Sequence, residues 1–142
     1  MSTNFLITLP DYDDTTHYLS AWGKEIIIVA KNSDLKVFDL LGEKANRKEF
    51  ESKIKNLSPK LIMLNGHGDD NLVTGNKDEV LIKAGENDGL LKSKIIYALS
   101  CRSAKILGSE SIKKGALNYT GYIDDFIFMY EPNLFSRPNL DK

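Results

Sequence analysis

Cysteine, histidine and long apolar runs are all scarce in this chain of 142 residues. It contains one cysteine, Cys101, and two histidines, which excludes an internal disulfide and any multi-cysteine metal site. A lone thiol fits a reducing compartment, so we expect a cytoplasmic protein. No apolar run approaches the roughly 20 residues that span a bilayer, and no basic leader opens the chain. We therefore expect no membrane partner.

An excess of positive charge is also absent. Nineteen Lys and Arg residues stand against twenty Asp and Glu residues, for a net charge of -1. Nucleic acids are bound through basic surfaces, so a nucleic-acid partner is not expected. The hydrophobic content of 42% is enough for one globular domain with its own core.

Strand-like and helix-like segments alternate along the chain. Five segments have the apolar, β-prone character of strands: 4–10, 35–40, 61–65, 95–100 and 116–123. After the first of them, Tyr18, Trp22, Ile26 and Val29 recur at helical spacing, and we expect them in the core. Asn46 and Glu49 resemble a capping box that opens a second helix, and a short helix is expected at 103–108.

This order predicts an α/β fold, a three-layer α/β/α sandwich with a mostly parallel sheet of about five strands. The run "LVTGNKDEVLI" between the third and fourth strands predicts a small surface hairpin. From Glu131 onward, two prolines and no periodicity predict an irregular tail. We expect a domain over 1–130 and a tail over 131–142.

The stretch "LIMLNGHGDD" places His67 directly after the third strand, and Cys101 follows the fourth. Ligand chemistry in such sheets gathers at the carboxyl ends of the strands. If the two strands are neighbours, imidazole and thiol face each other across a cleft, which suits nucleophilic catalysis. Arg102 and a helix N-terminus would favour the thiolate.

Two glycines flank this histidine. Gly66 allows a sharp turn after the strand, and Gly68 lets a backbone N–H approach a substrate carbonyl. Together with the N–H of Cys101, the Gly68 N–H could form an oxyanion hole.

The blocks "LIMLNGHGDD", "IIYALSCRSAKILG" and "GALNYTGYI" resemble the caspase-like (clan CD) cysteine peptidases, and are closest to the CHAT-domain proteases. The resemblance implies a caspase-like fold and a cysteine endopeptidase that acts through a thioester acyl-enzyme. It makes Cys101 the nucleophile and His67 the general acid/base, with Gly68 in the oxyanion hole. Relatives continue with another helix and strand, so we expect the domain to lack these elements.

Partner and ligand expectations follow from the same residues. Asp11 and Asp124 could form an acidic pocket that favours Arg or Lys in a protein or peptide substrate. A regulatory partner or further domains of a longer protein would complete the unit. His67, Asp69 and Asp70 have no second histidine beside them, so we expect no metal, and no cofactor motif is present.

Two other functions are also compatible with the sequence. The first is a non-catalytic caspase-like scaffold or partner-binding module. The second is a flavodoxin-like or receiver-like domain that binds a small ligand at the carboxyl ends of the strands.

The other histidine of the chain, His17, is expected to be a surface residue of the first helix.

Overall fold

Five parallel strands form the centre of the molecule. A computed structural model describes residues 3–126 of the chain. The strands run in the order β2-β1-β3-β7-β8, and every adjacent pair is parallel. Their bounds are β1 Thr3–Leu9, β2 Leu35–Leu41, β3 Leu61–Asn65, β7 Ile95–Leu99 and β8 Asn118–Thr120. The predicted α/β fold with a parallel sheet of five strands is confirmed.

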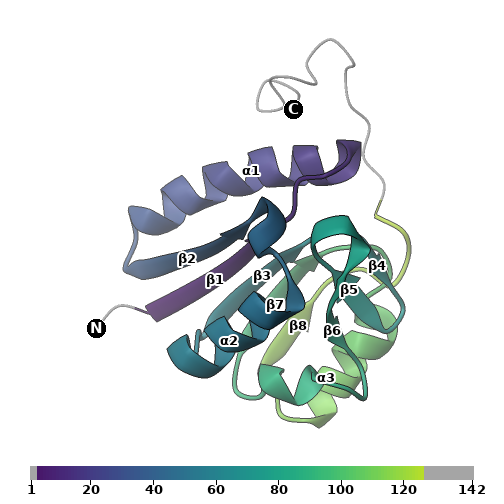
Figure 1. Ribbon diagram of the computed structural model, residues 1–142. Helices are drawn as coiled ribbons and strands as arrows, with labels where there is room; N and C mark the ends of the chain where they lie inside the picture. The colour runs from purple at the N-terminus through teal and green to yellow at the C-terminus, as the bar shows by residue number, and fades with distance from the viewer. Residues whose placement is uncertain (1–2, 127–142) are drawn as a thin grey trace.

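Helices lie on both faces of this sheet (Figure 1). Helix α1, Asp14–Lys31, covers one face, while α2, Arg47–Leu57, and α3, Ser109–Lys113, lie on the other. The arrangement is a three-layer α/β/α sandwich. None of the helices within residues 3–126 combines the length and the apolar character that crossing a bilayer requires.

A small antiparallel sheet follows β3. It consists of β4, Gly68–Asp69, β5, Leu72–Thr74, and β6, Val80–Lys83. The predicted hairpin corresponds to β5 and β6, so it is confirmed, with β4 as an additional strand. Short 3-10 turns occur at Gly42–Lys44, Asn76–Asp78 and Asp88–Leu91.

Side-chain caps set the starts of the two long helices. The Asp13 carboxylate accepts a hydrogen bond from the Thr16 backbone N–H at 2.9 Å and one from the Thr16 hydroxyl at 2.7 Å. The Asn46 side chain accepts from the Glu49 backbone N–H at 2.9 Å. These caps satisfy N–H groups that have no partner inside the helix.

The core is divided between the two faces of the sheet. On the α1 face the buried cluster contains Phe5, Ile7, Leu9, Ala30 and Met63. The cluster on the other face is larger, because α2, the small sheet and the segment before α3 all contribute to it: Phe50, Ile54, Val73, Leu81 and Leu107 are among its members.

The predicted core of the first helix is partly wrong. Ile26 is 37% exposed and Val29 is 67% exposed. The segment "IIIV" is apolar around most of the helix, but a helix on a sheet can bury only one side. Leu19, Gly23 and Ala30 occupy that side.

Three further boundaries differ from the predictions. The helical segment predicted at 103–108 continues to residue 113, as a π-helical turn, Ala104–Gly108, followed by α3. The last strand, β8, is shorter than the predicted 116–123. The predicted tail at 131–142 lies outside the described residues.

Candidate functional site

The carboxyl ends of β1, β3 and β7 bring three loops together. β3 and β7 are neighbours, paired from Leu61 opposite Ile95 to Asn65 opposite Leu99. The Gly66 N–H donates to the Leu99 carbonyl at 3.3 Å, which extends this contact one residue beyond β3. His67 and Cys101 therefore both lie at this edge of the sheet, as the sequence predicted.

Both glycines beside His67 are required by the backbone around them. Gly66 has φ +153°, and a Cβ there would lie 2.6 Å from the Thr74 carbonyl oxygen. A Cβ on Gly68 would lie 2.8 Å from the Cys101 carbonyl oxygen. Gly68 and Cys101 are thus in contact, and the glycine allows this close approach.

The imidazole of His67 points toward the start of α1. Its Nε2 lies 2.7 Å from Asp13 Oδ2, and the ring lies edge-on to Tyr12 with centroids 6.2 Å apart. Burial raises the pKa of Asp13, but the hydrogen bonds from Thr16 and His67 outweigh it, so the pKa lies below its ordinary value.

The thiol of Cys101 has a different partner. Its Sγ accepts a hydrogen bond from the Phe126 N–H at 3.2 Å and lies 3.6 Å from the Phe126 carbonyl oxygen. Arg102, the neighbour expected to favour a thiolate, instead contacts Asp69 at 2.9 Å and Asp70 at 3.3 Å. Within residues 3–126, His67 and Cys101 make no hydrogen bond to each other.

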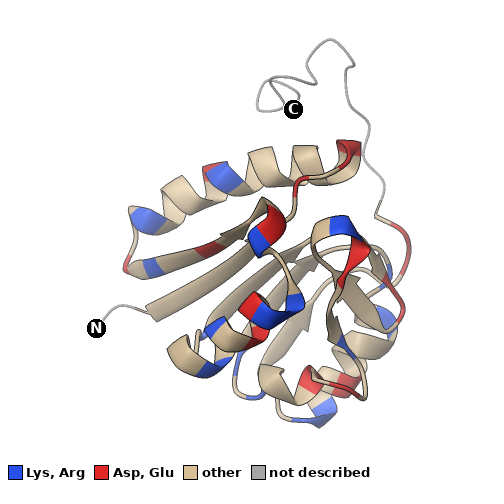
Figure 2. Cartoon of the chain, in the orientation of Figure 1, with Lys and Arg blue, Asp and Glu red and all other residues tan. Residues whose placement is uncertain are grey.

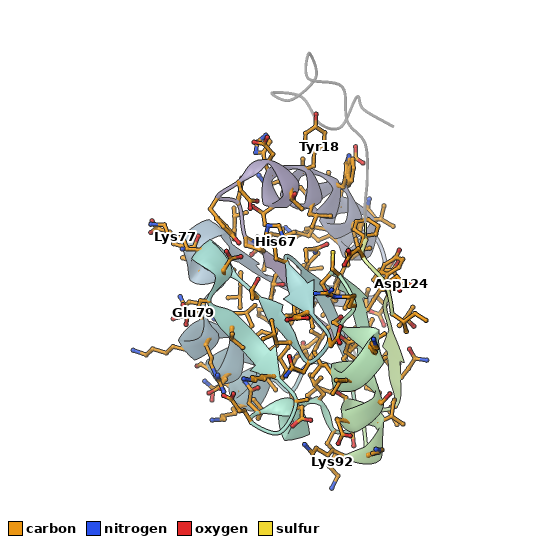
Figure 3. The ribbon with its side chains drawn as sticks, turned by 90° about the vertical axis from the view of Figure 1, so that its right-hand side faces the viewer. Tyr18, His67, Lys77, Glu79, Lys92 and Asp124 are labelled. Carbon is orange, nitrogen blue, oxygen red and sulfur yellow. The ribbon has the colours of Figure 1, made fainter. Side chains whose placement is uncertain are left out.

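Asp11 and Asp124 occupy different parts of this edge. Asp11 Oδ1 lies 3.1 Å from His17 Nδ1, and Asp11 lines a pocket of about 300 Å³. The residues lining this pocket are Asp11, Tyr12, Asp13, Asp14 and His17, so Asp124 is not among them. Figure 3, which views this end of the strands, shows His67 near the centre of the molecule and Asp124 at its right-hand side. The backbone carbonyl of Asp124 accepts from the Arg102 N–H at 3.0 Å.

Negative charge accumulates along this edge. Figure 2 shows acidic residues at the N-terminal end of α1 and in the loop that follows β8. The pocket at the start of α1, which we call the acidic pocket, is lined by three carboxylates and by no Lys or Arg. Within residues 3–126 no group of three or more His, Cys, Asp or Glu side chains is arranged to hold a metal ion.

Three residues that line the acidic pocket, Tyr12, Asp13 and Asp14, were not predicted from the sequence as site residues. Asp13 joins the start of α1 to His67, and the Tyr12 hydroxyl donates to the carboxylate of Asp78, in the 3-10 turn between β5 and β6. Burial and this hydrogen bond raise the pKa of Tyr12. A signal for Asp13 was present, because an aspartate before an apolar helical run is a typical helix cap.

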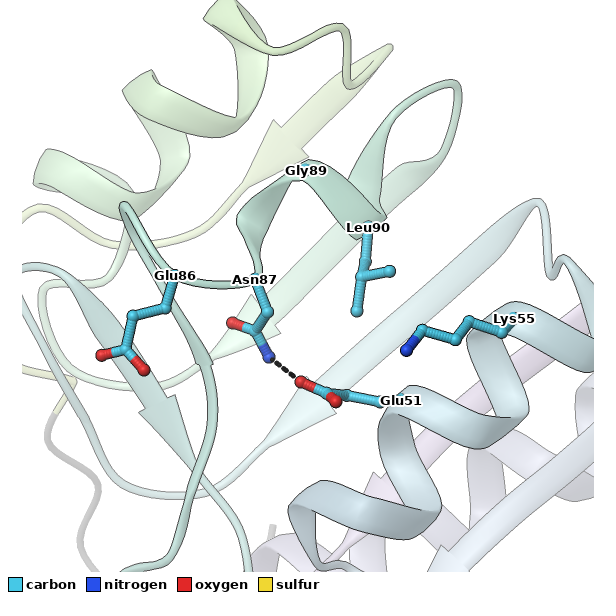
Figure 4. Close-up of a pocket in the computed structure, with 6 residues that line it drawn as sticks. All are labelled: Glu51, Lys55, Glu86, Asn87, Gly89 and Leu90. Carbon is cyan, nitrogen blue, oxygen red and sulfur yellow. Dashed lines mark hydrogen bonds between the residues drawn. The ribbon is translucent and has the colours of Figure 1, made fainter.

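A second hollow lies between α2 and the loop after β6 (Figure 4). It has a volume of about 350 Å³ and is lined by Glu51, Lys55, Glu86, Asn87, Gly89 and Leu90. Glu51 already accepts from Asn87 at 2.8 Å and from Arg47 at 3.1 Å. The Asn87 contact, together with Arg47 Nη1 at 3.1 Å from Glu86, ties α2 to the loop, so the polar residues that line this hollow have a structural role.

Replacing Asp13 with alanine is expected to lower the free energy of unfolding by about 1–2 kcal/mol, because it removes the cap of α1. Asparagine caps helices nearly as well, so Asp13→Asn should have a smaller effect. The Asp13 carboxylate has a lowered pKa in the folded chain, so its contribution is present at neutral pH and is lost as the pH falls below about 4.

Chemical denaturation at pH 7 and at pH 3 checks this. The difference between wild type and Asp13→Ala should shrink at the lower pH, and an unchanged difference would show that the charge of Asp13 is not involved. Asp34→Ala, at an exposed position outside the pocket, serves as the control.

Comparison with known proteins finds a similar solved structure. No family model matches the chain, and no curated protein matches it in sequence. A solved structure, the response regulator domain of Thermotoga maritima CheB, is similar to it with a TM-score of 0.49 and 14% sequence identity. The match covers 99% of this chain and 91% of that chain.

This finding corrects the family and function predicted from the sequence. The similar structure is a response regulator domain, and no comparison supports a caspase-like or CHAT-domain protease. The prediction of a cysteine endopeptidase acting through Cys101 is therefore wrong. The hydrogen bonds in the structure agree with this correction, because His67 binds Asp13 and the Cys101 thiol binds the Phe126 backbone. The catalytic roles of His67, Gly68 and Cys101 are not part of the function proposed below.

Proposed function

We propose that this chain is a non-catalytic α/β module that binds a basic segment of a regulatory partner protein through the acidic pocket. The observation that carries the proposal is the lining of this pocket, which has three carboxylates and no Lys or Arg. A guanidinium or ammonium group is the chemical complement of such a surface.

The walls of the acidic pocket are held in place by contacts on several sides. Asp13 is fixed by the helix cap and by His67, while Tyr12 is bonded to Asp78. Asp11 contacts His17, one turn into α1. Because these side chains are already oriented, little conformational entropy is lost when a basic side chain enters.

Surrounding charge also favours a cationic partner. Asp69 and Asp70 lie along the same edge, and Arg102 contacts both of them. Arg102 also lies 3.6 Å from Asp125, and Lys105 lies 3.8 Å from Asp70, so two cations face three carboxylates and negative charge remains in excess. This charge would accelerate the approach of a basic segment, most strongly at low salt.

Peptide binding tests the proposal. A fluorescent arginine-rich peptide should bind the chain, more tightly at low salt than at about 150 mM salt, and a glutamate-rich peptide of equal length should not bind. The double variant Asp11→Asn/Asp14→Asn should weaken binding at least about fivefold, roughly 1 kcal/mol, because two attractive charges are removed.

The matched control is Asp34→Asn/Glu110→Gln, which changes the net charge equally but alters residues outside the acidic pocket. It should bind within about twofold of wild type. Cys101→Ser should also bind like wild type, because Cys101 does not line the acidic pocket. If both double variants weakened peptide binding equally, binding would depend only on the net charge of the chain, and the proposal would be overturned.

A further inference from the structure

Strand β7 presents apolar side chains on a side of the sheet that the helices leave partly open. Ile95 is 38% exposed and Tyr97 is 42% exposed. By strand register they lie on the same face as Leu61 and Met63 of β3, which is the α1 face. Strands of parallel sheets are normally covered on both faces, so this exposure is unusual.

Helix α1 covers only part of that face. It packs on β2, β1 and β3, and its Gly23 approaches Leu9 of β1 and Asn65 of β3. Beyond β3 the sheet continues with β7 and then β8. Within residues 3–126 no second helix lies beside α1 on this face (Figure 1).

One flank of α1 continues the open apolar surface. The connection from β1 through α1 to β2 is a right-handed crossover, which turns Ile26 and Val29 toward the β7 side of the helix. Ile27, on the opposite side, packs against the same buried cluster as Leu35 and Val37 of β2. We call the surface formed by Ile26, Val29, Ile95 and Tyr97 the β7 face.

The width of this surface corresponds to one helix. Adjacent strands lie about 4.8 Å apart, so β7 and β8 together leave a strip about 10 Å wide. That width equals the diameter of an α-helix with its side chains, about 10–12 Å. A helix lying beside α1 would also restore the layer that covers a parallel sheet.

We propose that the β7 face is the docking site for an amphipathic helix of a partner protein. Its apolar stripe would cover Ile95 and Tyr97 from above and contact Ile26 and Val29 from the side. This proposal is independent of the acidic pocket, which lies at the start of α1 and has a different chemistry.

Charge at one end of the surface indicates the orientation of the docked helix. The loop after β8 carries Asp124 and Asp125; the Asp125 side chain is 57% exposed and lies 3.6 Å from Arg102 Nε. The Ala104 N–H donates to the Tyr122 carbonyl at 3.0 Å and the Arg102 N–H donates to the Asp124 carbonyl at 3.0 Å, which places this loop at the carboxyl end of β7. A helix antiparallel to the strands would direct its positive N-terminal end, with Lys or Arg nearby, toward these carboxylates.

A synthetic peptide tests this docking site. It has 18 residues, leucines at i, i+3, i+4 and i+7 spacing, lysines in its first two turns and glutamates in its last two. Its binding to the full chain is measured by fluorescence anisotropy. We expect it to bind more tightly than a peptide of the same composition without the stripe and than one with its charges reversed.

Single substitutions on and beside the surface locate the binding. Val29→Lys and Ile95→Lys should each weaken peptide binding about tenfold. Ile28→Lys is the matched control, because Ile28 is 62% exposed on the other flank of α1, and it should change binding less than twofold. Circular dichroism and thermal unfolding verify that all three variants are folded.

Two results would overturn the proposal. One is equal binding of the striped peptide to wild type, Val29→Lys and Ile95→Lys. The other is a dimer in light scattering that Val29→Lys dissociates, because a second copy of the chain would then occupy the surface. The arginine-rich peptide should bind Val29→Lys as it binds wild type, so failure here is distinguishable from failure of the acidic pocket.

Discussion

Replacing Phe50 with alanine is expected to lower the free energy of unfolding by about 3–5 kcal/mol and the melting temperature by roughly 10 °C. Phe50 is completely buried in the larger core cluster. It joins α2 to the sheet and to the small antiparallel sheet, so its removal leaves a cavity between three elements. The loss combines the transfer free energy of the ring with the missing contacts around it.

Chemical denaturation measures this loss, with Phe50→Leu and Lys53→Ala as controls. Leucine keeps most of the volume, so Phe50→Leu should cost less than about 1.5 kcal/mol. Lys53 is half-buried on the same helix but lies outside the core cluster, so Lys53→Ala should cost less than about 1 kcal/mol. A cost below about 1 kcal/mol for Phe50→Ala would show that α2 does not belong to the cooperative core.

Replacing Lys114 with methionine is expected to cost about 3 kcal/mol, because it leaves a buried carboxylate without its cation. Both oxygens of Asp88 accept from the Lys114 ammonium at 2.7 Å. The Asp88 side chain is 2% exposed, whereas that of Lys114 is 38% exposed. Without Lys114, the carboxylate would keep only the Gly85 N–H at 3.2 Å.

The reverse substitution should be milder. In Asp88→Asn the ammonium of Lys114 can turn to water, so we expect a cost of about 1 kcal/mol. Lys113→Met is the matched control: its Glu110 partner lies 3.1 Å away, but Lys113 is 71% exposed, and such surface pairs contribute less than about 1 kcal/mol. Equal unfolding free energies for Lys114→Met and Lys113→Met would contradict the argument.

The architecture was predictable because local patterns control it. Continuous apolar runs predicted the strands at 61–65 and 95–100, and Asn46 with Glu49 predicted the start of α2. The structure places the strand β3 at Leu61–Asn65 and caps α2 with Asn46. A strand that is buried on both faces has an unbroken apolar run, and the unpaired N–H groups at the start of a helix favour a capping side chain. Each of these signals is contained within a few consecutive residues.

The predicted Cys–His chemistry was wrong because these two side chains hydrogen-bond to other groups. The sequence placed His67 and Cys101 at neighbouring strand ends, and the structure does so. Hydrogen bonds then depend on side-chain direction, and His67 turns to Asp13 while the thiol turns to Phe126. Asp13 is 54 residues away in the chain, so no spacing rule connects it to His67.

By itself, the sequence determined the elements, their order and the edge of the sheet at which polar residues gather, because strand and helix periodicity are local properties of the chain. Only the tertiary structure decided which carboxylates form the acidic pocket and which side of α1 stays open. Those outcomes depend on where α1 lies over the sheet. A helix that is apolar on most sides, as at Ile26 to Val29, can bury only the side that meets the sheet.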